Sequence, residues 1–300
     1  HDTMLEENPW NWLARNKDYH PAEQIAGTER TYYSADLMNP GYFNHIKNKL
    51  VGLYQDYGIR HFKFDLYRLA AYDTLLGDAQ LHYEAYRALL EALKQEIPGL
   101  VISMDVTRNS RPNFDFALDY GRLFLENRGR NIPDHRYYHP YMALGNLWYT
   151  LQYAPVSHCE IEMMPQAMDY PLEYILGTTI FATPLYWGVI DNTPPERQAE
   201  MKAFYQKIAP YRKKFAAGLT SAEGEMPGKG TWSAIVSVAP DGREGFIAVY
   251  RNGADQPDYE FSLPFGKEAR KIFGGGTARI EQEKLKVHLP EEFSCALYQF

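Results

Sequence analysis

Residues 39–66 read NPGYFNHIKNKLVGLYQDYGIRHFKFDL, and they hold the clearest structural signal in the chain. Apolar side chains recur at helical spacing through the first part of the stretch, which predicts a helix over 39–57. Pro40 suits the first turn of that helix, and Gly58 stops it. Residues 59–66 then predict a strand, because apolar residues alternate along it and the charges gather at its end.

The alternation of helix and strand continues to residue 216. Further strands are predicted at 100–106, 121–126, 156–163 and 178–187, and further helices at 78–96, 112–119, 140–153, 166–176 and 195–216. Short connections between such elements indicate a parallel sheet with crossover helices. The sequence therefore predicts an α/β fold of the (β/α)₈-type (TIM) barrel, with chemistry at the C-terminal ends of the strands. An open doubly wound sheet is the alternative, although no glycine-rich phosphate loop follows any predicted strand.

The predicted strands are too few for a closed barrel. Eight β/α units of about 30 residues each are needed, and residues 1–216 supply five clear strands with a partial one at 31–36. The chain is therefore expected to hold a barrel that lacks its first strands, and its opening stretch, 1–27, resembles the middle of a longer protein. Two explanations stay open, since either a missing N-terminal segment or a second chain in an oligomer would complete the barrel.

The hydrophobic pattern of the sequence changes after Gly218. Helical periodicity gives way to short alternating segments at 231–238, 244–251, 258–263, 278–288 and 294–300. Turn signals such as Asn252-Gly253 separate these segments. The pattern predicts an antiparallel β-sandwich. We therefore expect a catalytic barrel domain at 1–217 and a C-terminal β-sandwich domain at 218–300.

Composition and charge argue against several classes of partner. The net charge of −7 and the pI near 5.8 speak against nucleic-acid binding. No apolar run is long enough to span a membrane, so no membrane is expected as a partner, and the sequence does not indicate a compartment. Aromatic residues make up 15% of the chain, which suits a protein that stacks sugar rings. A tyrosine-rich core and surface is the alternative explanation.

Neither the cysteines nor the histidines show the spacing of a metal site. Cys159 and Cys295 lie far apart in the sequence, and we expect both to be small buried hydrophobic residues. The sequence therefore predicts no metal and no cofactor.

Three acidic residues stand at the C-terminal ends of predicted strands, namely Asp65, Asp105 and Glu126. Hydrolysis of a glycosidic bond with retention needs two carboxyls about 5–5.5 Å apart, one as nucleophile and one as acid and base. Lys63 lies two residues before Asp65, so both side chains share one face of the strand. A lysine there keeps the aspartate ionised and can donate to sugar hydroxyls. A structural ion pair at the barrel rim is the alternative interpretation.

Three motifs resemble the α-galactosidases of glycoside hydrolase families 27 and 36. They are Asp36-Leu37-Met38-Asn39-Pro40, then Asp56-Tyr57-Gly58-Ile59, then Phe62-Lys63-Phe64-Asp65. The motifs that carry the resemblance fall within residues 31–216. Beyond them, the general sequence pattern agrees more weakly through residue 300. It implies a catalytic barrel from about its third strand onward, followed by a C-terminal β-sandwich. It also implies Asp65 as the nucleophile and Lys63 as a ligand of the sugar.

The resemblance further implies an acid/base after the strand two units beyond the nucleophile. Glu126 stands there, 61 positions after Asp65 (126 − 65), although the families usually have an aspartate. Asp119 is the alternative acid. Asp105 occupies a position that touches the sugar in these families, and a rim ion pair is its other interpretation. Arg128 either contacts the substrate or holds Glu126.

These residues together predict a retaining exo-α-glycosidase that hydrolyses terminal α-linked sugars of an oligosaccharide or glycoside, with α-galactosides first. Trp12, in the opening stretch, either stacks a sugar or packs inside the fold. A non-catalytic carbohydrate-binding pseudoenzyme or fragment is the second hypothesis, which the missing strands and the glutamate at position 126 motivate. An α-glycosyl-transferring relative, similar to raffinose synthase, is the third, and it would prefer a sugar acceptor to water.

Overall fold

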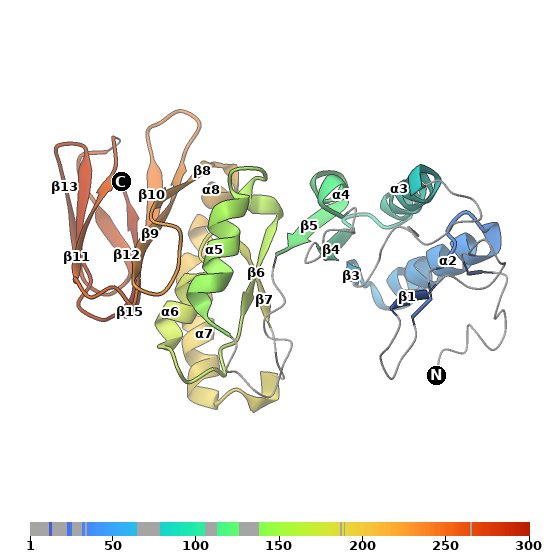
Figure 1. Cartoon of the computed structure of the whole chain (residues 1–300), viewed down its shortest axis with the longest axis horizontal. Helices are drawn as coiled ribbons and strands as arrows, with labels where there is room; N and C mark the ends of the chain where they lie inside the picture. The colour runs from blue at the N-terminus through green and yellow to red at the C-terminus, as the bar shows by residue number, and fades with distance from the viewer. Residues whose placement is uncertain are drawn as a thin grey trace. The chain divides into compact units, whose positions relative to one another are not determined.

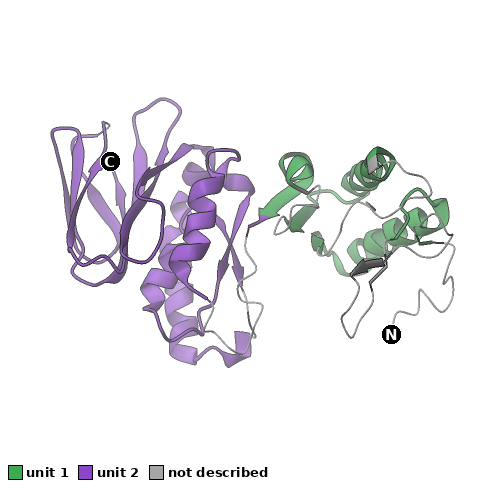
Figure 2. Ribbon diagram, in the orientation of Figure 1, with its two compact units in different colours: residues 1–123 green, residues 124–300 purple. Residues whose placement is uncertain are grey.

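The structure is a computed structural model, and it describes most of the chain (Figure 1). The described residues are 12–13, 23–25, 32–33, 35–64, 79–105, 113–125, 138–186, 188, 190–264 and 266–300. They fall into two compact units, residues 1–123 and residues 124–300 (Figure 2).

Five described strands form one sheet in the order β3-β4-β5-β6-β7. The strands are β3 (His61–Phe64), β4 (Val101–Asp105), β5 (Gly121–Phe124), β6 (Cys159–Met163) and β7 (Thr183–Tyr186). The helices between and around them are α2 (Pro40–Tyr57), α3 (Ala79–Glu96), α4 (Asn113–Tyr120), α5 (Pro140–Thr150), α6 (Leu172–Gly177), α7 (Pro195–Ile208) and α8 (Arg212–Ala217). The pairs β3/β4 and β6/β7 are parallel. Because the order in the sheet follows the order in the chain, helices connect neighbouring strands as they do in a (β/α) barrel.

Helix α2 begins at the cap that the sequence predicts. The side-chain oxygen of Asn39 accepts hydrogen bonds from the backbone N–H groups two and three residues on, at 2.9 and 3.3 Å. Asp36 adds a second local bond, because its Oδ1 accepts from the backbone N–H of Met38 at 2.9 Å. At the other end Gly58 has a φ of 70°, a left-handed conformation that glycine adopts at little cost. The first of the three motifs therefore has a structural role at the start of a helix.

Replacing Asn39 with alanine is expected to lower the free energy of unfolding by about 1 kcal/mol, because two N–H groups of the first turn lose their acceptor. Asn39→Asp keeps an acceptor at the same place and is the matched control. Urea unfolding followed by circular dichroism measures both variants. An equal loss in the two would show that the cap does not stabilise α2.

The partial strand predicted at 31–36 does not join the parallel sheet. Instead β1 (Glu23–Ile25) and β2 (Tyr32–Tyr33) pair with each other in a separate antiparallel sheet. An antiparallel partner nearby in the chain is reached by a short connection, whereas a parallel partner needs a long crossover. Among the described strands, β3 is consequently an edge of the parallel sheet.

Two predicted elements of the second unit are shorter or interrupted, each for a local reason. The strand predicted at 178–187 starts only at Thr183, because the hydroxyls of Thr178 and Thr179 bond back to carbonyl groups of helix α6, both at 2.8 Å. The helix predicted at 195–216 is interrupted by the 3₁₀ turn η5 (Ala209–Tyr211). Pro210 lies in that turn and has no backbone N–H to donate to a continuous helix.

The C-terminal region is an antiparallel β-sandwich of two sheets, ordered β12-β15-β10-β9-β8 and β11-β14-β13. Its strands are β8 (Leu219–Gly224), β9 (Thr231–Val238), β10 (Gly245–Asn252), β11 (Asp258–Ser262), β12 (Arg270–Gly274), β13 (Thr277–Glu281), β14 (Lys284–His288) and β15 (Phe293–Gln299). Its core contains Trp232, Val249, Phe261, Leu285 and Tyr298. The predicted fold class, a partial (β/α) barrel followed by an antiparallel β-sandwich, is thereby confirmed.

One segment predicted as a single strand, 278–288, is a hairpin. Strands β13 and β14 pair antiparallel around the two-residue turn Gln282-Glu283. Both turn residues have positive φ, 50° and 60°, as the tight turns that match strand twist require. The sequence carries no glycine or asparagine there, so the usual turn signal is absent.

Helix α6 packs against the sandwich through buried polar contacts within the second unit. The hydroxyl of Tyr174 donates to Asn252 Oδ1 at 2.7 Å, and the hydroxyl of Tyr250 donates to the Gly177 carbonyl at 3.1 Å. Gly177 lies so close to Cys295 that a methyl group at position 177 would overlap the sulfur. Both cysteines are buried and free, as the sequence predicts. The end of the partial barrel and the sandwich therefore share one packed interior.

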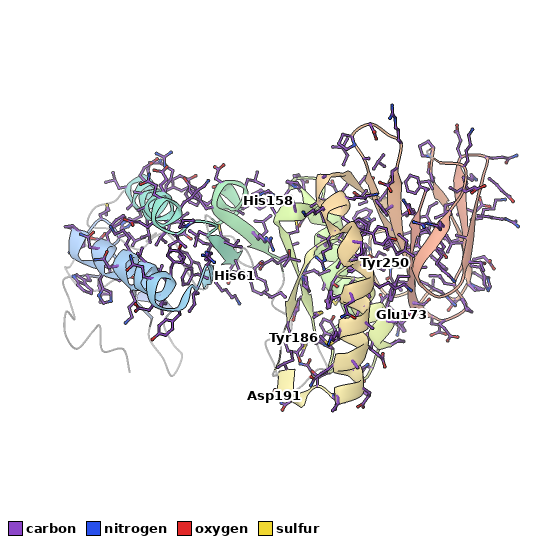
Figure 3. The ribbon with its side chains drawn as sticks, turned by 180° about the vertical axis from the view of Figure 1, so that it is seen from behind. His61, His158, Glu173, Tyr186, Asp191 and Tyr250 are labelled. Atoms are coloured by element: carbon purple, nitrogen blue, oxygen red, sulfur yellow. The ribbon has the colours of Figure 1, made fainter. Side chains whose placement is uncertain are left out.

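A hollow of about 230 Å³ lies beside this contact, between α6, α7 and β12. Glu173 lies at the edge of this hollow (Figure 3). Burial raises the pKa of its carboxyl, and Glu200 adds to the effect. A backbone hydrogen bond from Gly275 and the charges of Lys207 and Lys271 act in the opposite direction. The net shift is upward, so the ionised carboxyl is disfavoured in the folded state.

We expect Glu173→Gln to raise the melting temperature at neutral pH and to have little effect near pH 4. A raised folded-state pKa means that the folded chain holds the proton to a higher pH than the unfolded chain does, so stability falls as pH rises through the interval between the two pKa values. Below the unfolded-state pKa, about 4.3 for glutamate, the penalty is absent. Glu292→Gln, at an exposed loop position, is the control. Thermal unfolding across this pH range tests the difference, and a gain that did not depend on pH would contradict it.

Candidate functional site

Three of the predicted site residues are described, and three are not. Asp65, Glu126 and Arg128 lie outside the described residues, so their roles stay predictions. Strand β3 ends at Phe64, one position before Asp65, and the described stretch around β5 ends one position before Glu126. The residues that can be placed are Lys63, Asp105 and Trp12.

Strands β3 and β4 bring Lys63 and Asp105 to one face of the sheet. In the parallel register Lys63 lies opposite Ser103. The Nε2 atom of His61 and the Oγ atom of Ser103 are 2.6 Å apart, so these two side chains point to the same side. Alternation along each strand then places Lys63 and Asp105 on that side as well. Asp105 is the last residue of β4 and is fully buried.

The opposite face of the same two strands is apolar. It carries Phe62 and Phe64 on β3 and the fully buried Ile102 and Met104 on β4. The Phe64 ring lies 6.4 Å from the ring of Tyr86 on helix α3, so this face packs against helices. A sheet in a (β/α) barrel turns one face to the helices and the other to the barrel interior. The polar face, with His61, Lys63, Ser103 and Asp105, is therefore the interior-facing one.

Strand β6, in the second unit, has the same two-faced pattern. Its sequence Cys-Glu-Ile-Glu-Met puts Glu160 and Glu162 on one face and three apolar residues on the other. Both carboxyls are buried. Burying a carboxylate is costly, so such residues are seldom kept for packing alone. Neither glutamate is among the site residues predicted from the sequence, although their strict alternation inside a predicted strand was the available signal.

Trp12 packs inside the first unit. Its ring lies 5.8 Å from Tyr42 and 5.0 Å from His45, both on the first turns of helix α2. Its backbone carbonyl accepts a hydrogen bond from the N–H of Asp36 at 2.8 Å. These contacts fit the packing interpretation, and stacking on a sugar stays a prediction.

Asp119, the alternative acid, lies at the wrong end of its strand. It is on helix α4, two residues before β5 begins. Because β5 follows directly, Asp119 lies at the N-terminal end of that strand, whereas barrel chemistry is placed at the C-terminal ends. Its backbone carbonyl instead accepts a hydrogen bond from Lys94 Nζ at 2.9 Å, which joins α4 to α3.

The segment that follows β6 is held by side chains of the second unit. Arg197 donates to the carbonyl groups of Pro165 and Ala167 at 2.7 and 2.8 Å. The Nδ1 atom of His139 and the hydroxyl oxygen of Tyr170 are 2.6 Å apart. Because this segment leaves the C-terminal end of β6, these bonds fix the backbone at the edge where a barrel places its chemistry.

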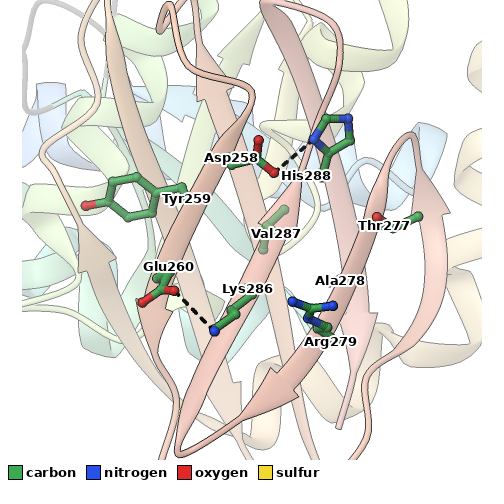
Figure 4. Close-up of a pocket in the computed structure, with 9 residues that line it drawn as sticks. All are labelled: Asp258, Tyr259, Glu260, Thr277, Ala278, Arg279, Lys286, Val287 and His288. Atoms are coloured by element: carbon green, nitrogen blue, oxygen red, sulfur yellow. Dashed lines mark hydrogen bonds and ion pairs between the residues drawn. The ribbon is translucent and has the colours of Figure 1, made fainter.

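A second hollow, about 720 Å³, lies on the exposed face of the sheet β11-β14-β13 (Figure 4). Its charges pair across the strands, for His288 Nδ1 is 3.0 Å from Asp258 and Lys286 Nζ is 3.6 Å from Glu260. Both pairs are direct neighbours in the strand register. Cross-strand pairs of opposite charge stabilise a sheet, so this hollow has a structural explanation.

The described residues hold no group of histidine, cysteine or carboxylate side chains that could bind a metal ion. In the part of the chain that the structure describes, no helix combines the length and the apolar character needed to cross a membrane.

Comparison with known proteins was informative only at the level of structure. The sequence matches no protein-family model and no curated protein. The galactosidase domain of the α-galactosidase–sucrose kinase AgaSK aligns with a TM-score of 0.72 and 14% identity, over 100% of this chain and 41% of that one. A family 36 α-galactosidase, AgaA from Geobacillus stearothermophilus in complex with raffinose, aligns with a TM-score of 0.69 and 13% identity, over 99% of this chain and 42% of that one.

A further solved structure, the debranching enzyme from Nostoc punctiforme, aligns with a TM-score of 0.59 and 12% identity, over 99% of this chain and 72% of that one. The chain thus spans about two fifths of the length of the α-galactosidases that it matches. The resemblance stated from the sequence motifs is confirmed for the fold. The chain has the fold of part of the family 36 α-galactosidases, a partial parallel barrel followed by an antiparallel β-sandwich.

Proposed function

We propose that the chain carries catalytic strands of a retaining exo-α-glycosidase, with α-galactosides as its first candidate substrates. The observation that carries the proposal is the polar face of β3 and β4, on which Lys63 and the buried Asp105 lie at the strand ends. Barrel enzymes place chemistry at these ends. The fold is a second support, since its structural neighbours are glycoside hydrolases, among them complexes with raffinose and stachyose.

In the proposed mechanism, Asp65 attacks the anomeric carbon and forms a covalent glycosyl-enzyme, while Glu126 gives a proton to the departing oxygen. Glu126 then takes a proton from water, and the water releases the sugar with its original configuration. Lys63 holds Asp65 in its ionised form and donates to a sugar hydroxyl. Asp105 accepts from another hydroxyl, and Arg128 positions Glu126 or contacts the substrate. We propose no metal or cofactor, because double displacement needs neither.

The test is an activity assay coupled to a binding assay on the same chain. Release of nitrophenol from nitrophenyl α-galactoside measures hydrolysis, and NMR of the first sugar released reads the anomer. Release of the α anomer supports a retaining glycosidase, whereas the β anomer would exclude double displacement. A set of nitrophenyl α-glycosides of other sugars extends the assay if galactose is not the sugar.

A carbohydrate-binding protein without turnover is the second candidate. It is favoured by the glutamate at position 126, where the families that the sequence resembles usually have an aspartate. Calorimetric titration with raffinose separates the two, because binding without release of any nitrophenol supports this candidate. Product formation only when a sugar acceptor is added would instead support glycosyl transfer. A second chain or an N-terminal segment that completes the barrel is part of the proposal, and adding it is expected to raise turnover.

A further inference from the structure

Two tyrosines stand exposed side by side at the end of helix α5. Tyr149 is 52% exposed and Tyr153 is 59% exposed. Their ring centroids are 5.5 Å apart, and their hydroxyl oxygens are 3.4 Å apart. Large aromatic side chains are usually at least half buried when they serve only to pack. The high exposed fraction of both tyrosines therefore indicates another role.

Hydrogen bonds and buried neighbours fix the backbone that carries the two tyrosines. The backbone N–H groups of Tyr153 and Ala154 both donate to the Thr150 carbonyl, at 2.9 and 3.0 Å. Ala154 and Leu147 are buried beneath the surface. Both rings are therefore presented by a fixed backbone, which lowers the entropy cost of binding a ligand.

The segment of chain that carries the pair is uncharged. From Pro140 to Cys159 the sequence contains no aspartate, glutamate, lysine or arginine, whereas 23% of the whole chain is charged. Polar groups are present as hydroxyls and amides, among them the exposed Gln152. This segment itself offers no ion of opposite sign to a phosphate, a nucleic acid or a charged peptide. A neutral ligand with hydroxyl groups finds donors and acceptors.

The small area of the two exposed rings also indicates which kind of ligand they bind. Between Pro140 and Cys159, these two rings are the only large hydrophobic side chains that are exposed. A stable protein interface buries roughly 800 Å² on each partner around an apolar centre. Two rings flanked by polar groups provide far less, but they match the apolar face of a pyranose, which stacks on a flat aromatic ring.

The pair lies near the N-terminal end of strand β6, within the second unit. Helix α5 leads through the 3₁₀ turn η3 (Val156–His158) into the N-terminal end of β6. The segment held by Arg197 leaves the opposite, C-terminal end of the same strand. A sugar on the tyrosine pair would therefore lie at the N-terminal end of β6, whereas barrel enzymes place their chemistry at the C-terminal ends of strands.

We propose that Tyr149 and Tyr153 form a secondary binding platform for neutral carbohydrate, which holds a glycan chain on the outside of the barrel. The platform goes beyond the proposed hydrolysis and does not require it. It binds by stacking sugar rings on the two tyrosines, and the hydroxyl and amide groups beside them contact the sugar hydroxyls.

The experiment is native electrophoresis in gels cast with increasing amounts of galactomannan, a neutral polysaccharide that bears α-galactosyl branches. The unmodified chain is expected to be retarded, and Tyr149→Ala/Tyr153→Ala is expected to bind about tenfold more weakly because two stacking contacts are lost. Tyr149→Phe/Tyr153→Phe keeps both rings and should stay close to the unmodified chain. Tyr57→Ala is the matched control, since Tyr57 is 75% exposed on helix α2 beside charged residues.

Three results would overturn the platform. They are no retardation of the unmodified chain, equal retardation of the alanine pair, and a change of molar mass by light scattering in the alanine pair, which would make the patch a self-association surface. If the double variant Tyr149→Ala/Tyr153→Ala does not fold, the single variant Tyr153→Ala is tested instead. Tyr153 lies beyond the last residue of α5, so its replacement does not change the helix itself. Asp65→Asn should retain the retardation, so a failure of the proposed hydrolysis is distinguished from a failure of the platform.

Discussion

Replacing Asp65 with asparagine is expected to reduce turnover of nitrophenyl α-galactoside by on the order of 10⁴-fold, with the fold intact. The amide has nearly the shape of the carboxyl, but it is a poor nucleophile toward an anomeric carbon. The covalent intermediate is then not formed, and the route by double displacement is closed. Steady-state kinetics measure the loss, and circular dichroism with thermal unfolding shows that the variant is folded.

Asp56→Asn is the matched control for this experiment, because it makes the same change at an exposed carboxyl on helix α2. It should leave kcat/KM unchanged. A sharper readout uses Asp65→Gly with added azide, which can occupy the space of the missing carboxyl and yield a glycosyl azide of inverted configuration. A structural ion pair between Lys63 and Asp65 would give no such product. Undiminished turnover in Asp65→Asn would remove the proposed mechanism.

Replacing Arg251 with methionine is expected to have the largest effect on stability. Arg251 is 4% exposed, and its guanidinium donates to four backbone carbonyl groups. The acceptors are those of Ala254, Asp255, Leu289 and Pro290, at 2.8, 2.9, 3.0 and 2.7 Å. These carbonyls belong to two separate loops of the sandwich, which the arginine therefore joins. Methionine fills much of the volume but leaves the acceptors without donors, at a cost of about 3 kcal/mol or more.

Chemical unfolding of the sandwich measures this loss. Arg251→Lys should recover only part of it, because one ammonium cannot reach four carbonyls spread around a planar guanidinium. Arg243→Met is the control, since Arg243 is exposed in the turn between β9 and β10 and its side-chain Nε lies 3.8 Å from Asp241 Oδ2. A loss of similar size in Arg243→Met would show that the effect comes from removing a charge rather than from the buried bonds.

Much of the fold could be predicted from the sequence because its signals are local. The cap at Asn39, the stop at Gly58 and the apolar run of β4 each act through neighbours in the chain. The differences between the predicted and the observed elements also have physical causes. Nothing in the residue types of Gln282-Glu283 marks a turn with positive φ, because the strands on both sides impose it.

The site was less predictable than the fold. Asp105 was predicted from its place at a strand end and Lys63 from its spacing to Asp65, and the strand register places Lys63 and Asp105 on one face, which the sequence did not predict. Whether Asp65 and Glu126 meet depends on how strands far apart in the sequence are brought together, which a strand-by-strand pattern does not contain. Glu160 and Glu162 were missed because two carboxylates inside a strand usually indicate a solvated face, and only the structure shows both buried.

The close approach of Gly177 to Cys295 constrains any hybrid that grafts this sandwich onto another barrel. The donor barrel would have to offer glycine at the matching helical position, since even alanine would push the helix away from the sheet. Such a displacement would also break the bonds from Tyr174 and Tyr250, which require the same spacing. A hybrid joined at Gly218, where the sequence pattern changes, would therefore carry only the sandwich side of this contact. The matching residues of helix α6 would have to be transferred with it.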